Sequence, residues 1–113
     1  MDEYVTQNDV DQYELLLPLL QASYHEIETL SKKKPDSPLN AYKVKVINRI
    51  LDPIKELLKS EPSFVFLDTL NTDELPTNSD VVLLLSQYQK SMNIYHTEHY
   101  SNSTYQWKIK KQK

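Results

Sequence analysis

Residues 79–100, SDVVLLLSQYQKSMNIYHTEHY, carry the clearest helical pattern of this chain. Apolar and aromatic side chains recur in this stretch at alternating spacings of four and three residues, the period that lines one side of an α-helix. Thr77 and Asn78 offer side-chain oxygens that can cap its first turn. The stretch therefore predicts a long amphipathic helix that buries one side against neighbouring elements. The repeating side chains are Val81, Leu85, Tyr88, Met92, Tyr95 and His99.

Two earlier stretches carry the same helical period, one before residue 35 and one within residues 38–60. Pro18 and Pro53 lie inside these patterns, and a proline removes one backbone hydrogen bond of a helix. We therefore expect each proline to kink its helix or to divide it into two. The first stretch repeats Tyr13, Leu16, Leu20, Ile27 and Leu30, and the second repeats Val44, Ile47, Leu51, Ile54 and Leu58.

Three such helices predict an all-α protein, an antiparallel three- to four-helix bundle with kinked helices over residues 1–104. Residues 63–70 are too short for periodicity to separate helix from strand, and the preceding proline favours a short helix packed over the bundle. Residues 105–110 alternate apolar and polar side chains, which is the period of a strand. We expect residues 105–113 to form an extended aromatic-basic C-terminal tail. The tail should fold back on the bundle, pair with a strand around Tyr4 and Val5, or dock on a partner.

The chain of 113 residues contains no glycine and no cysteine. Phosphate-cradling loops, dinucleotide-binding turns and strained nucleophile turns all need glycine, so the composition excludes these sites. The lack of cysteine excludes disulfides and thiolate metal sites. No apolar run approaches the length of a bilayer span, and the acidic N-terminus does not resemble a signal peptide. We therefore expect a cytoplasmic protein with no membrane partner.

The segment His96-Thr97-Glu98-His99 is the one compact cluster of metal-capable groups in the sequence. Its two histidines are three residues apart and could share a helix face, whereas Glu98 should point elsewhere. We expect His99 to end the apolar seam and His96 to be solvated. The sequence thus predicts no metal site, no cofactor and no catalytic residue.

We expect a non-enzymatic protein–protein interaction module, a small accessory, regulatory or inhibitor-like subunit. Eight tyrosines and one tryptophan suit this role, because large amphipathic rings are typical of interfaces. The expected partner is another protein or a second copy of the same chain. The expected partner-binding residues are Tyr95, His96, His99, Tyr100, Tyr105, Trp107, Lys108 and Ile109.

The alternative function is nucleic-acid binding through a basic helix and a lysine tail. The first 31 residues contain no lysine or arginine, whereas residues 32–59 contain eight. Such a basic stretch can contact phosphates, although the whole chain carries a net charge of −3. The residues expected for this alternative are Lys43, Lys45, Arg49, Lys110 and Lys111.

Overall fold

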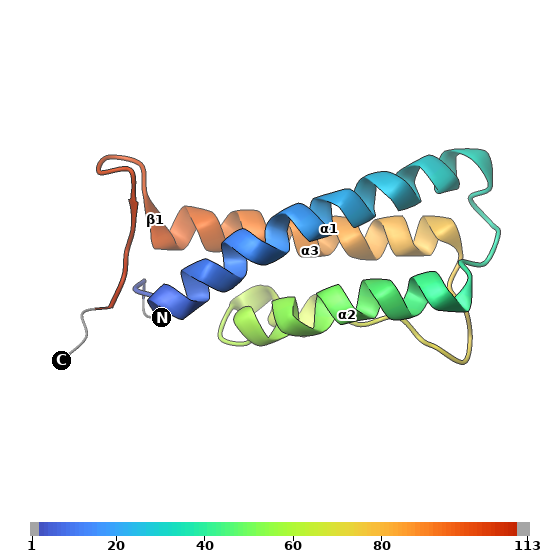
Figure 1. Ribbon diagram of the computed structural model, residues 1–113, viewed down its shortest axis with the longest axis horizontal. Helices are drawn as coiled ribbons and strands as arrows, with labels where there is room; N and C mark the ends of the chain where they lie inside the picture. The colour runs from blue at the N-terminus through green and yellow to red at the C-terminus, as the bar shows by residue number, and fades with distance from the viewer. Residues whose placement is uncertain (1–2, 111–113) are drawn as a thin grey trace.

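The structure is a computed structural model that describes residues 3–110 and is mostly helical (Figure 1). Its three α-helices contain 27, 17 and 22 residues. No helix among these described residues is long and apolar enough to cross a membrane. The helices are α1 (Gln7–Lys33), α2 (Ala41–Leu57) and α3 (Asn78–His99), and a short 3-10 helix, η1 (Pro62–Phe66), lies between α2 and α3.

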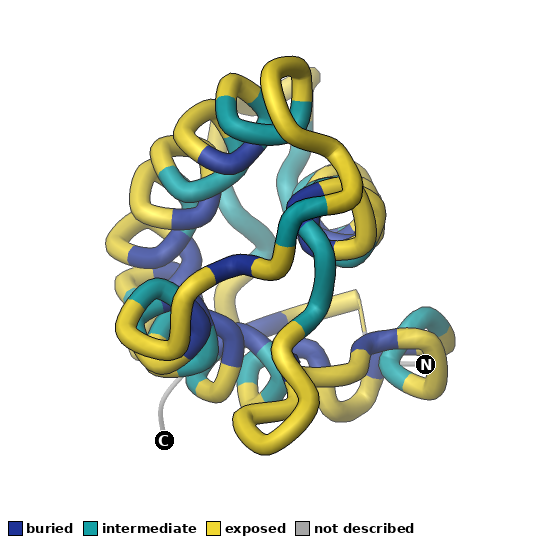
Figure 2. The backbone as a smooth tube through the Cα atoms, turned by 90° about the vertical axis from the view of Figure 1, so that its right-hand side faces the viewer, coloured by how far each residue is buried: buried dark blue, intermediate teal, exposed yellow. Residues whose placement is uncertain are grey.

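The helix α1 packs against both α2 and α3. Figure 1 shows α1 running in the opposite direction to α2 and α3, which point the same way. The chain must therefore travel back along the molecule between α2 and α3, and residues 58–77 make this return. Viewed from one end, the buried positions of the helices face the interior while the outer surfaces are exposed (Figure 2).

The apolar stripes predicted from the sequence form the core. All six repeating residues of α3 are buried, from Val81 to His99. The stripe of α2 is buried through Leu58, and in α1 only Leu30 of the predicted set is partly exposed. Burial of these side chains is the main source of stability, at about 25 cal/mol per Å² of apolar surface.

Both α1 and α2 continue through their prolines, so of the two alternatives at each proline, a kink or a division, the structure excludes the division. Each proline removes a single backbone hydrogen bond. The apolar stripe continues on both sides, with Leu16 and Leu20 buried around Pro18 and Leu51 and Ile54 buried around Pro53. Packing of these neighbours keeps the helical path, and the bend expected at each proline stays a prediction.

Polar contacts hold the returning segment against the helices. The side-chain amide of Asn48 in α2 donates to the carbonyl of Leu70 at 2.9 Å and accepts from the Leu70 amide at 2.8 Å. The Tyr88 hydroxyl in α3 donates to the Asp68 carbonyl at 2.7 Å. These bonds satisfy backbone groups that have no helical partner, and Leu67 and Leu70 are buried beside them. The short helix predicted within residues 63–70 is present as η1.

The C-terminal tail packs on the rest of the chain. Strands β1 (Tyr100–Ser101) and β2 (Gln106–Trp107) form an antiparallel hairpin, and Ile109 forms a parallel bridge with Val5. The Val5 amide donates to the Lys108 carbonyl at 2.9 Å, and the Lys110 amide donates to the Val5 carbonyl at 2.8 Å. Of the three placements that the sequence leaves open for the tail, this is the pairing around Tyr4 and Val5. Residues 111–113 of the predicted tail lie outside the described residues.

The hairpin turn makes Tyr105 adopt a positive φ of 56°, and no other residue within the described range 3–110 does so. This left-handed conformation favours glycine, because a Cβ atom crowds the following carbonyl at a cost of roughly 1–2 kcal/mol. A chain without glycine must place another residue there. The tyrosine side chain is 80% exposed, so the turn holds a large ring out in solvent.

We predict that Asn48→Ala lowers the free energy of unfolding by about 2 kcal/mol, because it leaves the Leu70 amide and carbonyl without partners in a partly buried site. Urea denaturation monitored by circular dichroism measures this loss. The control is Asn93→Ala at an exposed position of α3. Equal stability of the two variants would contradict the role of Asn48.

We predict that Tyr105→Gly raises the free energy of unfolding by about 0.5–1 kcal/mol, because glycine adopts a positive φ without steric cost. The melting temperature should rise by a few degrees. Asn102→Gly in the same turn should lower it, since glycine there only adds freedom to the unfolded chain. A lower melting temperature for Tyr105→Gly would show that the turn is not strained.

Candidate functional site

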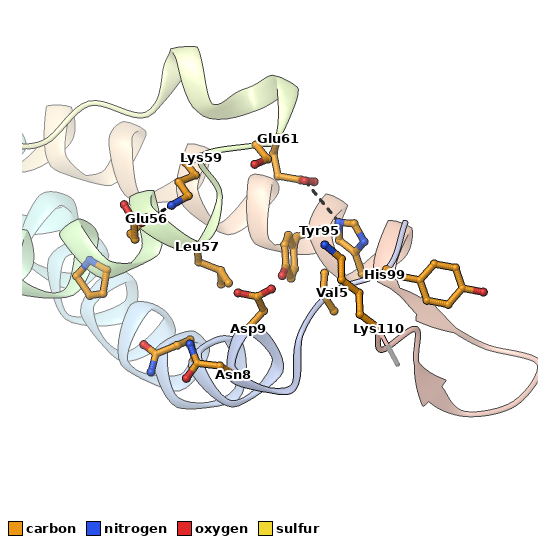
Figure 3. A pocket seen from close by; sticks show the side chains of 14 residues that line it. Val5, Asn8, Asp9, Glu56, Leu57, Lys59, Glu61, Tyr95, His99 and Lys110 are labelled. Carbon is orange, nitrogen blue, oxygen red and sulfur yellow. Dashed lines mark hydrogen bonds and ion pairs between the residues drawn. The ribbon is translucent and has the colours of Figure 1, made fainter. Parts of the chain in front are cut away.

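A cluster of charged and polar side chains lies at the end of the molecule where both terminal segments meet. A cavity of about 510 Å³ opens between the start of α1, the end of α2, the end of α3 and the C-terminal tail (Figure 3). Charged and polar side chains dominate its lining, and two aromatic rings and a few apolar side chains complete it. The residues labelled in Figure 3 are Val5, Asn8, Asp9, Glu56, Leu57, Lys59, Glu61, Tyr95, His99 and Lys110.

His99 is held at the wall of this cavity by the backbone of the N-terminal segment. Its side chain is 3% exposed, and its Nδ1 lies 2.6 Å from the Glu3 carbonyl oxygen. A carbonyl only accepts hydrogen bonds, so Nδ1 carries a proton and donates it. This contact orients the ring and leaves Nε2 facing the carboxylate of Glu61 at 3.5 Å (Figure 3).

Glu61 is the residue that sequence reasoning missed. Its side chain is 7% exposed, and its Oε1 has no hydrogen-bond partner among the described residues. Burial raises the pKa of the Glu61 carboxyl above its usual range, and nearby Glu98 acts in the same direction while His99 opposes it. Glu61 lies 38 residues before His99 in a polar turn, so no spacing pattern in the sequence connects the two.

Glu98 completes the cluster, contrary to the expectation that it points elsewhere. Its Oε2 lies 3.9 Å from His99 Nε2, although the two residues are adjacent in sequence. The helix ends at His99, so the side chains of its last residues can converge at the terminus. One ligand-capable atom from each of Glu61, Glu98 and His99 falls within 4.8 Å of the others.

An aromatic cluster surrounds Trp107 on the neighbouring surface. The Trp107 ring centroid lies 5.0 Å from that of Tyr13, 5.2 Å from His96 and 5.6 Å from Tyr100. His96 is half-buried and stacks on Tyr100 at 4.5 Å, so it is not the solvated residue that the sequence suggested. Tyr95 contacts both Tyr13 and Trp107 and is buried.

The predicted partner-binding residues therefore lie together, but most of their surface is used within the chain. Tyr95 and His99 are buried, and His96, Tyr100, Trp107 and Lys108 are half-buried. Lys108 pairs with Glu3 at 3.3 Å. Tyr105 and Ile109 are the members of the set that are exposed.

The residues predicted for nucleic-acid binding do not form one surface. Lys43 pairs with Glu26 of α1 at 3.5 Å, while Lys45 and Arg49 are exposed on α2. Lys110 lines the cavity in the tail, and Lys111 lies outside the described residues. The first half of α2 and the tail lie toward opposite ends of the molecule (Figure 1), so one short stretch of nucleic acid would not contact both. Binding of nucleic acid stays a prediction.

Comparison of the chain with protein-family models, with curated protein sequences and with solved structures finds no match.

We predict that Trp107→Ala lowers the free energy of unfolding by about 3 kcal/mol, because the ring fills a site lined by Tyr13, His96 and Tyr100. Trp107→Phe should retain most of the stability. Thermal unfolding of the two variants and the wild type measures the difference. If Trp107→Ala melts at the wild-type temperature, the tail does not contribute to the folded chain.

Proposed function

We propose that this chain is a non-enzymatic protein–protein interaction module, a small cytoplasmic accessory, regulatory or inhibitor-like subunit built on a helical bundle bent at its prolines. One observation supports the proposal most directly. Val65 and Phe66 are neighbouring residues of η1, and their side chains are 76% and 68% exposed. Two adjacent large apolar side chains in solvent are costly for the isolated chain and favourable in a complex.

The short helix holds these side chains in place. The Phe64 amide donates to the Glu61 carbonyl at 3.1 Å, and the Leu67 amide donates to the Phe64 carbonyl at 3.0 Å. Leu67 is buried immediately after the exposed pair, and Lys55 Nζ lies 5.5 Å from the centre of the Phe64 ring. Since the backbone of η1 is already ordered, this segment would lose little conformational entropy when a partner contacts Val65 and Phe66.

The proposed partner is a protein that offers an apolar pocket for the Phe66 ring. Phenylalanine and tyrosine are enriched in the buried centres of interfaces, where a few anchors carry most of the binding energy. Tyr105 and Ile109 remain available as further contacts from the set predicted by sequence. The aromatic residues around Trp107 are assigned instead to holding the tail on the helices.

We expect Phe66→Ser to reduce capture of a specific partner from native lysate by at least about ten-fold, because removal of an interface anchor costs 2 kcal/mol or more. Quantitative mass spectrometry of captured proteins measures the loss. Tyr42→Ser is the matched control, since Tyr42 is 76% exposed on the first turn of α2. Both variants should keep the wild-type melting temperature.

Light scattering of the purified chain separates a second copy from a different protein as the partner. A dimer that Phe66→Ser dissociates would identify self-association through the same surface. The proposal fails if nothing is captured and the chain is monomeric, or if the two variants lose binding equally.

A further inference from the structure

We propose that Glu61, Glu98 and His99 form a binding site for one divalent transition-metal ion, with Zn²⁺ as the best fit. The site is separate from the exposed surface of η1 and goes beyond the function proposed above. Its three ligands come from the turn after α2 and from the last residues of α3.

The spacing of the ligand atoms suits a small tetrahedral ion. His99 Nε2 lies 3.5 Å from Glu61 Oε2 and 3.9 Å from Glu98 Oε2, and all three ligand atoms are within 4.8 Å of one another. Zinc bonds to nitrogen and oxygen are about 2.0–2.1 Å long, so tetrahedral ligand atoms lie about 3.3 Å apart. Rotation of the Glu98 side chain, which is partly exposed, can supply the remaining adjustment.

The contact on the far side of the His99 ring has the form found in metal sites. A metal-binding histidine usually donates its second N–H to a carbonyl or carboxylate, which fixes the ring and the tautomer. Here Nδ1 donates to the Glu3 carbonyl at 2.6 Å. His99 Nε2, which faces the two carboxylates, is therefore the nitrogen available to bind a metal ion.

A second, independent feature is the unpartnered carboxylate oxygen of Glu61. Its Oε1 is buried and makes no hydrogen bond within residues 3–110, although the side chain is only 7% exposed. A buried polar atom without a partner destabilises the folded chain. A cation held by Glu61 through one or both oxygens would remove this destabilisation and balance the two carboxylates.

The cavity provides access and a free coordination position. Glu61 and His99 both line the cavity of about 510 Å³, and their side chains point toward each other (Figure 3). An ion entering there would take three ligands from the protein and a fourth from water. It would also link the residue preceding η1 to the end of α3.

Donor chemistry favours zinc over the alkaline-earth ions. One imidazole nitrogen and two carboxylates suit Zn²⁺, whereas Mg²⁺ and Ca²⁺ prefer six or more oxygen ligands. Co²⁺ accepts the same geometry and gives a visible absorption band. It can therefore report on the ligands directly.

The test is calorimetric titration of Zn²⁺ into the full, metal-free chain without a histidine tag. We expect one ion per chain, and Glu98→Gln should weaken binding at least about ten-fold. Glu98 is partly exposed, so this variant should fold like the wild type, which circular dichroism checks. His25→Gln is the matched control: it removes an exposed histidine of α1 that is not one of the three ligands.

Co²⁺ absorption spectra provide the second measurement. The wild type and His25→Gln should show the intense band of a tetrahedral site, and Glu61→Gln and Glu98→Gln should lose it. Binding weaker than about 100 µM, or equal affinity of the wild type and Glu98→Gln, would overturn the proposal. Loss of binding in His25→Gln would overturn it as well, because the ion would then sit elsewhere on the chain.

Discussion

Burial of the apolar stripe of α3 against α1 organises the other helix and the segments that connect the three. Tyr88, Leu85 and Met92 have no exposed surface, and α1 supplies the opposing side chains. Once these two helices are packed, α2 covers a second side of α1 with its own stripe. Because α2 and α3 point the same way, residues 58–77 must return along the molecule, and that return brings Glu61 beside His99 and leaves Val65 and Phe66 outside.

The absence of glycine shapes the ends of every element. The residues that cap the C-terminal ends of α1, α2 and α3 all have negative φ, so none is in the left-handed conformation. Lysines or histidines occupy the last turn of each helix. Only the hairpin of the tail needs a positive φ within residues 3–110, and Tyr105 supplies it. A stiff helical scaffold with one strained turn is the physical result of this composition.

The two chemical features of the molecule arise in different ways. The aromatic cluster around Trp107 joins α1, the last turns of α3 and the hairpin. All of its members except Tyr13 belong to the set that the sequence predicts for binding a partner. Sequence reasoning identified the residues but not what they contact, since an aromatic ring packs equally well against its own chain or a partner. The Glu61–Glu98–His99 cluster was not found, because Glu61 shares no periodicity or motif with the end of α3.

The amino-acid sequence predicts the three helices and their buried faces, because the helical period is a local property of the chain. Strand alternation likewise predicts an extended tail, but the sequence leaves open whether that tail folds back on the bundle, pairs near Val5 or docks on a partner. Tertiary packing accounts for three further outcomes: the helices continue through Pro18 and Pro53, Trp107 packs within the chain, and Glu61 lies buried beside His99. These outcomes depend on contacts between segments far apart in sequence, where packing outweighs local preference.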